Sequence, residues 1–273
     1  MKRKTGCLLW PKRIKKKVVP ELQRYFVPPE NWEDDQVHIT GDDTHHISRV
    51  MRLKAGDEII CSHPEGQAAI CTITRMDEGD VMVEIKEWLH TSNESPVSVT
   101  VAQALAKGDK FELVLQKGTE LGASAFIPLQ AERSVVVWDE KKAKKKMARY
   151  SKILKEASEQ SHRNKIPYLY SAMSISSLAE QSQGFDRKLF AYEEEAKTDA
   201  FQTYAQAVTR MKPGDSVLIV IGPEGGFSES EAALMKQEGF EPVRLGPRIL
   251  RTETAAMYAL ASISYHFEEM RCE

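Results

Sequence analysis

The segment that most constrains the fold runs from Val217 to Ser228 and reads VLIVIGPEGGFS. Its continuous apolar run predicts a strand buried on both faces, as in a parallel sheet covered by helices. The strand ends in GPEGG, and a helix begins at Ser228, where Glu231 completes a capping box. Ligands of open α/β sheets bind beyond the carboxyl ends of strands, and glycines let the backbone approach them closely. We therefore expect a ligand-binding loop at residues 222–226, although an ordinary strand-to-helix turn would share part of this pattern.

A second strand-to-helix junction follows. Pro242–Leu245 predicts a short strand, and the helix predicted over Thr252–Phe267 is rich in small residues. Small residues allow close helix packing, either within the core alone or around a site. Arg251 and Glu253 stand where the loop enters this helix, so they are either exposed caps or site residues.

The hydrophobic pattern divides the chain into two parts, separated by a polar, proline-terminated linker at Thr91–Pro96. Residues 22–90 predict a small β-rich domain. In residues 97–273 strands alternate with helices, which predicts an α/β domain with a mainly parallel sheet. The predicted strands are Leu22–Val27, Glu58–Ser62, Ala68–Thr74, Val81–Glu87, Val97–Leu105, Ala125–Leu129, Leu189–Ala191, Ser216–Ile221 and Pro242–Leu245, and the predicted helices are Thr44–Leu53, Lys110–Leu121, Lys141–Ser161, Ser228–Glu238 and Thr252–Phe267.

Composition limits the class of protein. The 273 residues are 41% hydrophobic, which is enough to build cores and argues against disorder. No run of about 18 apolar residues predicts a membrane span. The four cysteines, Cys7, Cys61, Cys71 and Cys272, lack the spacing of a zinc site. We therefore expect free thiols, no metal and a cytoplasmic location.

Charge is distributed unevenly along the chain. There are 38 Lys and Arg residues against 40 Asp and Glu residues, but residues 1–17 hold eight of the basic ones and no acidic one. The remainder, with 30 basic and 40 acidic residues, carries a net charge of −10. We expect residues 1–21 to be a disordered extension translated from upstream of the true start. A nucleic-acid-binding arm is the alternative, and a signal peptide is disfavoured because the apolar stretch is too short.

Two basic clusters stand out on this acidic body. Lys141–Lys155 holds eight basic residues and no acidic one, and His45–Lys54 contains three more. A solvated helix face is the usual explanation, but on an acidic body these clusters suggest contacts with RNA phosphates. His45 and His46 lack an acidic ligand at motif spacing, so we favour packing or RNA contacts over metal binding. The predicted RNA-binding residues are Arg24, Arg49, Arg52, Lys54, Lys145, Arg149, Lys152 and Arg163.

Four ordered motifs give the chain a specific resemblance: QKGTELG at Gln116–Gly122, EASEQSHR at Glu156–Arg163, GPEGGFS at Gly222–Ser228 and LGPRILRTETA at Leu245–Ala255. Together they closely resemble the RsmE family of SPOUT-class methyltransferases. The resemblance implies S-adenosylmethionine as methyl donor and methylation of N3 of a uridine in bacterial 16S rRNA, within the small ribosomal subunit. It also implies a homodimer, a PUA-like RNA-binding domain at the N-terminus and a C-terminal trefoil knot, a rare feature in proteins.

This resemblance makes the loops at 222–227 and 245–251 adjacent walls of one cofactor pocket. Catalysis of methyl transfer from a sulfonium would depend mainly on positioning, and negative charge on the uracil oxygens would need a nearby cation. Arg251 is the candidate for that cation, and Glu224 or Glu253 for the acceptor of the N3 proton. The predicted cofactor-binding residues are Ile221, Gly222, Pro223, Glu224, Gly225, Leu245, Gly246, Ile249, Leu250 and Thr254.

Two other functions compete with this one. A non-enzymatic, RNA-binding ribosome assembly factor would share the basic clusters and the β-rich domain, and binding of S-adenosylmethionine together with methyl incorporation would discriminate against it. A nucleotide-dependent oxidoreductase would need GxGxxG followed by an acidic residue about 20 positions later. The chain has no GxGxxG, so this function is strongly disfavoured.

Overall fold

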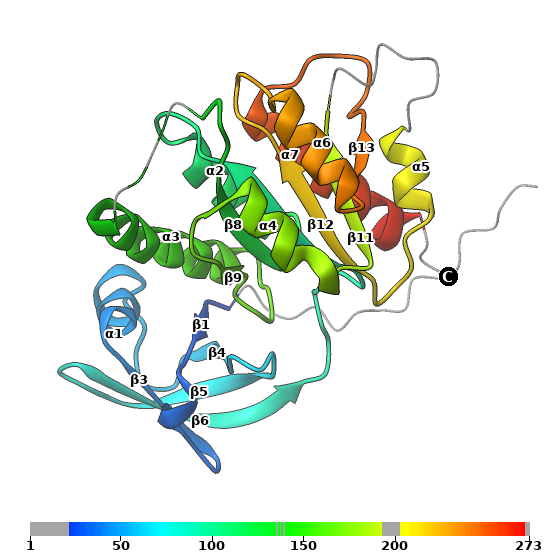
Figure 1. The fold of residues 1–273 in the computed structure, drawn as a ribbon. Helices are drawn as coiled ribbons and strands as arrows, with labels where there is room; N and C mark the ends of the chain where they lie inside the picture. The colour runs from blue at the N-terminus through cyan, green and yellow to red at the C-terminus, as the bar shows by residue number, and fades with distance from the viewer. Residues whose placement is uncertain (1–21, 135, 137, 139, 193–202, 271–273) are drawn as a thin grey trace, which may run out of the picture.

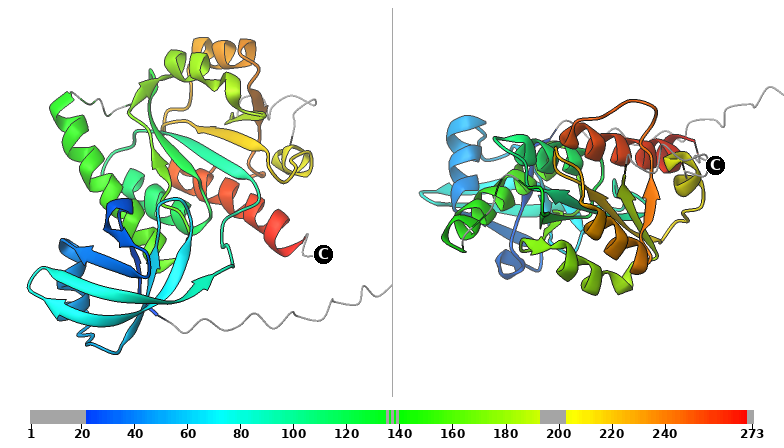
Figure 2. Two further views of the ribbon diagram at one scale, coloured as in Figure 1. Left: turned by 90° about the horizontal axis from the view of Figure 1, so that it is seen from below. Right: turned by 45° about the horizontal axis from the view of Figure 1, so that its top comes forward.

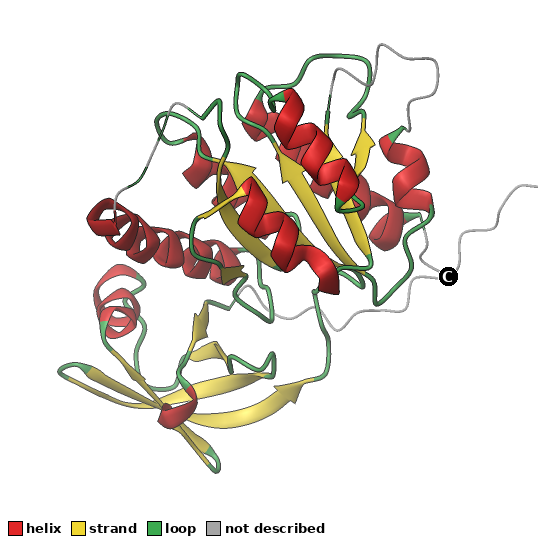
Figure 3. Cartoon of the chain, viewed as in Figure 1, coloured by secondary structure: helices red, strands yellow, loops and turns green. Residues whose placement is uncertain are grey.

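The computed structural model describes residues 22–134, 136, 138, 140–192 and 203–270. The predicted extension at 1–21 lies outside these residues, as do Cys7 and Cys272. The described chain forms a small β-rich unit and a larger α/β unit (Figures 1 and 3). Cys61 and Cys71 are free thiols, as the sequence predicted. Within the described residues, no helix is long and apolar enough to cross a membrane.

A six-stranded sheet makes up the N-terminal unit. Its strands β1 (Arg24–Phe26), β2 (Trp32–Glu33), β3 (Gln36–Thr40), β4 (Glu58–Ser62), β5 (Ala68–Asp77) and β6 (Asp80–Leu89) lie in the order β1-β4-β5-β6-β3-β2. β1 pairs with β4 in parallel, and the other pairs are antiparallel. Alternating residues such as Val37 and Ile39 fill its core. The sequence pattern missed β2 and β3: β2 has only two residues, and an acidic turn separates it from β3. A 3-10 turn, η1 (Pro29–Asn31), precedes β2.

The helix predicted over Thr44–Leu53 is shorter and less regular than expected. One α-helical turn, α1 (Asp42–His45), continues into a π-helical turn, η2 (His46–Val50). The chain then leaves the helix, because Arg52 adopts a left-handed conformation with φ of 56°. The amide of Leu53 donates back to the carbonyl of Ile47 at 3.0 Å, which fixes this exit.

A parallel sheet forms the centre of the C-terminal unit, as predicted. Its strands β7 (Ser98–Ala104), β8 (Ala125–Gln130), β10 (Met173–Ser174), β11 (Arg187–Ala191), β12 (Ser216–Ile221) and β13 (Glu241–Val243) lie in the order β10-β8-β7-β12-β11-β13, and β9 (Tyr168–Leu169) pairs with β8. All pairings among these described strands are parallel. The carboxyl ends of the central strands β7 and β12 therefore lie next to each other.

Helices cover both faces of this sheet (Figure 2). On β12, Val217 and Ile219 join the core of one face, while Leu218 and Val220 join the core of the other. This alternation explains why β12 must be apolar throughout. One face carries α2 (Lys110–Glu120), α3 (Glu140–Gln160), α5 (Tyr204–Thr209) and α7 (Thr252–Ser264). α7 continues into the π-helical turn η5 (Tyr265–Glu269). The other face carries α4 (Ile175–Gln181), the 3-10 turn η3 (Ser182–Gly184) and α6 (Glu229–Gln237). The sequence pattern missed α4, α5, β9 and β10, all of them short.

The QKGTELG motif serves close packing between α2, the sheet and α7. A Cβ atom on Gly118 would lie 2.7 Å from Cζ of Phe126 on β8 and 3.3 Å from Cδ1 of Leu260 on α7. Real Cβ atoms essentially never come within 2.7 Å of a ring, so α2 can lie this close to β8 because residue 118 is glycine. The glycine thus helps to place α2 between β8 and α7, and both helices begin at the carboxyl edge of the sheet.

Candidate active site

The loop after β12 has a fixed shape. The amide of Gly226 donates to the carbonyl of Pro223 at 2.9 Å, and Gly226 has a φ of 67°, which favours glycine. α6 then begins with the predicted capping box. The amide of Glu231 donates to Ser228 Oγ at 3.3 Å, and the amide of Ser228 donates to Glu231 Oε2 at 2.9 Å. The tip of the loop, residues 224–226, is held in an exposed position beyond the strand.

Hydrogen bonds join this loop to the start of α7. Thr252 Oγ1 donates to the carbonyl of Gly222 at 2.7 Å. The same oxygen accepts a hydrogen bond of 2.7 Å from Nε2 of Gln103, which lies on β7 and is 1% exposed. The ends of two neighbouring strands and the first turn of α7 therefore meet at one point. This is the edge at which open α/β sheets bind ligands.

Gln103 leaves one polar atom of this junction without a partner. Its Oε1 is buried and accepts no hydrogen bond from the described residues. Burying an amide oxygen in this state costs on the order of 1–3 kcal/mol, which a donor on a bound ligand would offset. The junction thus combines an open acceptor with the backbone of a glycine-rich loop.

Four charged side chains surround the junction. Lys110, at the start of α2, donates to Glu224 Oε1 at 2.6 Å, and the charges of Arg251 and Glu253 both act on Lys110. The hydrogen bond from Lys110 lowers the pKa of Glu224, and the same bond raises the pKa of Lys110. Glu253 Oε2, by contrast, is buried without a hydrogen-bond partner within the described chain. The site therefore holds one carboxylate that is paired and one with a free oxygen.

Our sequence analysis missed Lys110. The residue follows the carboxyl end of β7, and β7 is the neighbour of β12 in the sheet. A lysine in the loop after the strand predicted over Val97–Leu105 could therefore have been assigned to the site, had the pairing of that strand with Ser216–Ile221 been foreseen.

The predicted cofactor-binding residues differ in exposure. They comprise the buried Ile221, Pro223 and Leu245, the half-buried Gly222, Gly246 and Leu250, and the exposed Glu224, Gly225, Ile249 and Thr254. Gly246 has a φ of 78°, which only glycine adopts readily, and a Cβ atom there would lie 3.5 Å from the hydroxyl of Tyr258. Ile249 is 83% exposed, which is unusual for an isoleucine. Contact with a cofactor stays a prediction for each of these residues.

Six of the eight predicted RNA-binding residues form what we call the basic surface, defined as Arg49, Arg52, Lys54, Lys145, Arg149 and Lys152, all of them exposed. Arg49 lies on η2, and Lys145, Arg149 and Lys152 lie on α3. α1, which continues into η2, lies next to α3 (Figure 1). Lys155 on α3 binds Asp43 on α1 at 2.6 Å, and Lys152 lies 3.6 Å from Asp42. Cationic groups of both units therefore lie on neighbouring elements.

Two of the eight predictions are wrong. Arg24 is 7% exposed and Arg163 is 4% exposed, so neither guanidinium is available to an RNA phosphate. Arg24 Nη1 donates to Ser62 Oγ at 2.9 Å and to the carbonyl of Arg163 at 3.0 Å. Arg163 in turn forms an ion pair with Glu94. Both arginines are structural, and their partners are distant in sequence.

Among the described residues, no group of three or more His, Cys, Asp or Glu side chains could hold a metal ion. The polar groups gathered at the sheet edge are amides, carbonyls, one hydroxyl, the Lys110–Glu224 ion pair and the side chains of Arg251 and Glu253. These groups suit an organic ligand that donates and accepts hydrogen bonds, not a metal centre.

The sequence and the fold both match known RNA methyltransferases. Residues 93–264 match the profile of an RNA methyltransferase domain, and residues 39–86 match that of an RNA methyltransferase PUA domain. Ribosomal RNA small subunit methyltransferase E of Bacillus subtilis is 45% identical over 253 residues, which cover 92% of this chain and 99% of that protein. The chain belongs to the ribosomal RNA small subunit methyltransferase E family. The predicted resemblance to RsmE is thereby confirmed.

Other members of the methyltransferase E family extend the comparison to the cofactor. The protein of that name from Mycobacterium tuberculosis is 32% identical over 230 residues, covering 82% of this chain and 84% of its own. The crystal structure of the family member from Neisseria gonorrhoeae, bound to S-adenosylmethionine, matches with a TM-score of 0.78 and 29% identity over 90% of this chain and 98% of that one. A Legionella pneumophila structure with the same cofactor has a TM-score of 0.79 and 31% identity, over 90% and 98% of the two chains.

Proposed function

We propose that this chain transfers the methyl group of S-adenosylmethionine to N3 of a uridine in 16S rRNA. The observation that supports this most is the junction of Gly222, Thr252 and Gln103, which joins two loops at the ligand-binding edge of the sheet. The names of the relatives indicate the substrate class. Two related structures of similar fold, with TM-scores of 0.79 and 0.78, hold S-adenosylmethionine.

The residues at this edge fit that cofactor. S-adenosylmethionine, when bound, supplies a methyl group on a sulfonium together with an adenine and a ribose that donate and accept hydrogen bonds. The loops at 222–227 and 245–251, with Thr254 on α7, would hold it. The free Oε1 of Gln103 is the buried acceptor that a cofactor donor would satisfy. The backbone of the glycine-rich loop provides further donors and acceptors without side-chain obstruction.

Arg251 and Glu253 carry the proposed proton chemistry. The proton on uracil N3 must leave, and the charge that develops spreads onto O2 and O4, where the Arg251 guanidinium would stabilise it. Glu253 is the better proton acceptor of the two candidates. Lys110 occupies Glu224 and lowers the pKa of that carboxyl, which weakens it as a base, whereas Glu253 Oε2 has no hydrogen-bond partner in the described structure.

The basic surface is the proposed RNA-binding site. Phosphate contacts from both units would orient the RNA without reading its sequence. The body of the protein is acidic overall, so local clusters must provide the attraction. Contacts of Arg49, Arg52 and Lys54 would come from the PUA-like unit, and those of Lys145, Arg149 and Lys152 from α3.

Three further properties are part of this proposal: a homodimer, a trefoil knot in the C-terminal unit and a cytoplasmic location. The homodimer is supported by exposed apolar side chains along α7, η5 and the residue after η5: Tyr258 is 38%, Tyr265 61% and Met270 64% exposed. Exposed apolar side chains gathered on one element are typical of an interface between subunits. Sedimentation of a monomer at micromolar concentration would contradict the homodimer.

An experiment separates this enzyme from an RNA-binding assembly factor with the same surface. Calorimetry measures binding of S-adenosylmethionine, and a radiolabelled methyl group reports transfer to small-subunit RNA. We expect both binding and transfer. A protein that binds the RNA, but neither binds the cofactor nor transfers the methyl group, is an assembly factor.

A further inference from the structure

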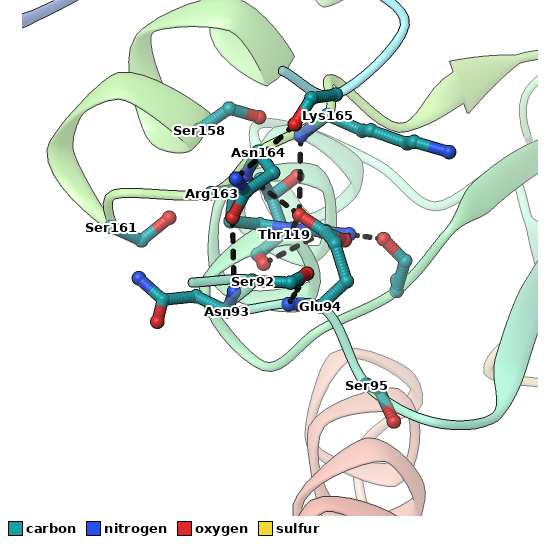
Figure 4. Close-up of polar contacts among 12 residues, drawn as sticks. Ser92, Asn93, Glu94, Ser95, Thr119, Ser158, Ser161, Arg163, Asn164 and Lys165 are labelled. Atoms are coloured by element: carbon teal, nitrogen blue, oxygen red, sulfur yellow. Dashed lines mark hydrogen bonds and ion pairs between the residues drawn. The ribbon is translucent and has the colours of Figure 1, made fainter. Parts of the chain in front are cut away.

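A single carboxylate in the linker between the two units collects several hydrogen bonds. Figure 4 shows Glu94 facing the end of α3. Its Oε1 accepts from the amides of Asn164 at 2.8 Å and Lys165 at 3.1 Å. The Arg163 side chain binds the same carboxylate through Nε and Nη2. Linker and helix end are therefore joined by four donors on one acidic side chain.

The Arg163 guanidinium extends this contact to α2. Its Nη1 donates to the carbonyls of Thr119, at 3.2 Å, and Ala123. Thr119 lies in the last turn of α2, where the helix carbonyls lack partners within the helix, and Ala123 lies in the loop that follows the helix. A positive charge there also interacts favourably with the helix dipole. Because Arg163 is 4% exposed, its charge depends on Glu94 for compensation.

Neighbouring residues connect the same cluster to the N-terminal unit. Asn164 Nδ2 donates to the carbonyls of Gly66, at 3.3 Å, and Thr91, at 3.4 Å, and its Oδ1 accepts from the amide of Asn93 at 2.9 Å. Arg24 on β1 donates to the carbonyl of Arg163. The cluster thus bonds the β-rich unit, the linker, α3 and α2 to one another.

α2 leads from this cluster to the proposed site. The helix spans eleven residues, a length of about 16 Å, and Lys110 stands at its other end beside Glu224. At Gly118 it packs against Phe126 of β8 and Leu260 of α7, the helix that begins at Thr252 directly after Arg251. A rotation of the β-rich unit relative to this cluster would therefore move Arg49, Arg52 and Lys54, its part of the basic surface, relative to the reacting groups.

We propose that Glu94, Arg163 and Asn164 are positioning residues for methyl transfer to RNA. They hold the β-rich unit at one angle, so that RNA bound on the basic surface presents its target base to the junction at Gly222 and Thr252. This inference rests on the proposed function. It concerns the RNA step alone, because none of the three side chains contacts the loops at 222–227 or 245–251.

The test compares Glu94→Gln and Asn164→Ala with a control variant, Arg210→Gln, which breaks an ion pair with Glu241 at the far edge of the sheet. We expect kcat/KM for small-subunit RNA to fall about tenfold to a hundredfold in the first two, as for a misplaced substrate. The affinity for S-adenosylmethionine should stay within twofold of the wild type. Arg163→Lys keeps the positive charge but loses the planar set of N–H donors, so its kcat/KM for small-subunit RNA should lie between those of the two variants and the wild type.

Amide hydrogen exchange distinguishes positioning from general instability. In the two variants, faster exchange should be confined to residues 91–96 and 163–165, while β12 and α7 stay protected. If Glu94→Gln fails to fold, Asn164→Ala carries the test, because it leaves the ion pair intact. Transfer within twofold of the Arg210→Gln control, with the linker amides exchanging faster, would overturn the inference. A wild-type protein without any transfer would instead overturn the proposed function.

Discussion

The loops at the carboxyl edge of the sheet and the basic surface on η2, the loop after it and α3 are encoded in different ways. The edge site depends on the backbone of contiguous segments. The apolar run of β12, the glycines after it and the Ser228–Glu231 capping box are all local features, so the sequence predicts where the loop lies and how it ends. The structure adds the Gln103–Thr252–Gly222 bonds but does not alter that prediction.

The basic surface depends instead on where long charged side chains find partners. Arg24 and Arg163 were predicted to bind RNA together with Arg49 and Arg149, yet the first two are buried. Their partners, Ser62 and Glu94, are 38 and 69 residues away in the sequence. The comparison teaches that a local motif predicts the position of a site built from backbone groups. Charge composition predicts that a basic surface exists, but it does not tell which of the charged side chains are exposed on it.

The largest expected effect is on the edge site. Arg251→Ala should lower turnover about a hundredfold or more while cofactor affinity stays nearly intact, because the guanidinium acts on charge that develops during transfer. Single-turnover kinetics and calorimetry measure the two quantities. Arg248→Ala, which removes another exposed arginine from the same loop, is the matched control. Equal losses of binding and turnover in Arg251→Ala would make it a cofactor or folding residue.

The cofactor loop gives the next largest effect. Gly225→Val should weaken binding of S-adenosylmethionine more than tenfold, or over about 1.4 kcal/mol, because it places a branched side chain where backbone meets ligand. The protein itself tolerates a Cβ atom there, since the nearest atom, Arg133 Cβ, is 3.4 Å away. Gly246→Val should have a similar effect but adds backbone strain at a φ of 78°.

The control for the loop is Gly184→Val, at a glycine with ordinary φ and open space around it. Calorimetry on the folded variants decides the comparison. Unchanged affinity in Gly225→Val would remove this loop from the cofactor site.

RNA binding at the basic surface should depend on the positive charges there and on the salt concentration. Arg49→Gln combined with Arg52→Gln should weaken RNA binding and reduce the slope of log affinity against log salt by roughly one to two units, since about two phosphate contacts are lost. Cofactor affinity should not change. Arg210→Gln combined with Lys212→Gln, at the far edge of the C-terminal unit, provides a charge-matched control. Deleting residues 1–17 should have a smaller effect, and a deletion that alone abolishes RNA binding would make that segment the RNA arm.

The smallest effect concerns the Lys110–Glu224 pair. Because Lys110 lowers the pKa of Glu224 in the folded protein, the pair stabilises the fold above the ordinary glutamate pKa of about 4.3, and this contribution is lost as the pH falls through the lowered value. A carboxyl titration by NMR should therefore show Glu224 titrating below other exposed glutamates. Lys110→Met should move the midpoint upward, and an unmoved midpoint would contradict the pairing.

The parts that the sequence did not predict share a physical cause. Short elements such as β2, β9 and α5 carry too few residues for a period to emerge, and tertiary contacts determine them. The helix ends early, after Val50, because the backbone of Arg52 is left-handed. An arginine at this position does not predict a left-handed conformation. Lys110 lies at the site because β7 pairs with β12, and these two strands are more than 100 residues apart in the sequence.

The central claim is that this chain methylates N3 of a uridine in 16S rRNA. The direct measurement incubates the purified protein and S-adenosylmethionine with small-subunit RNA from a strain lacking the gene, and maps the product nucleosides by mass spectrometry. We predict a single new 3-methyluridine, absent with Arg251→Ala over the same time. A methyl group on another base, on a ribose, or on no nucleoside at all would contradict the account.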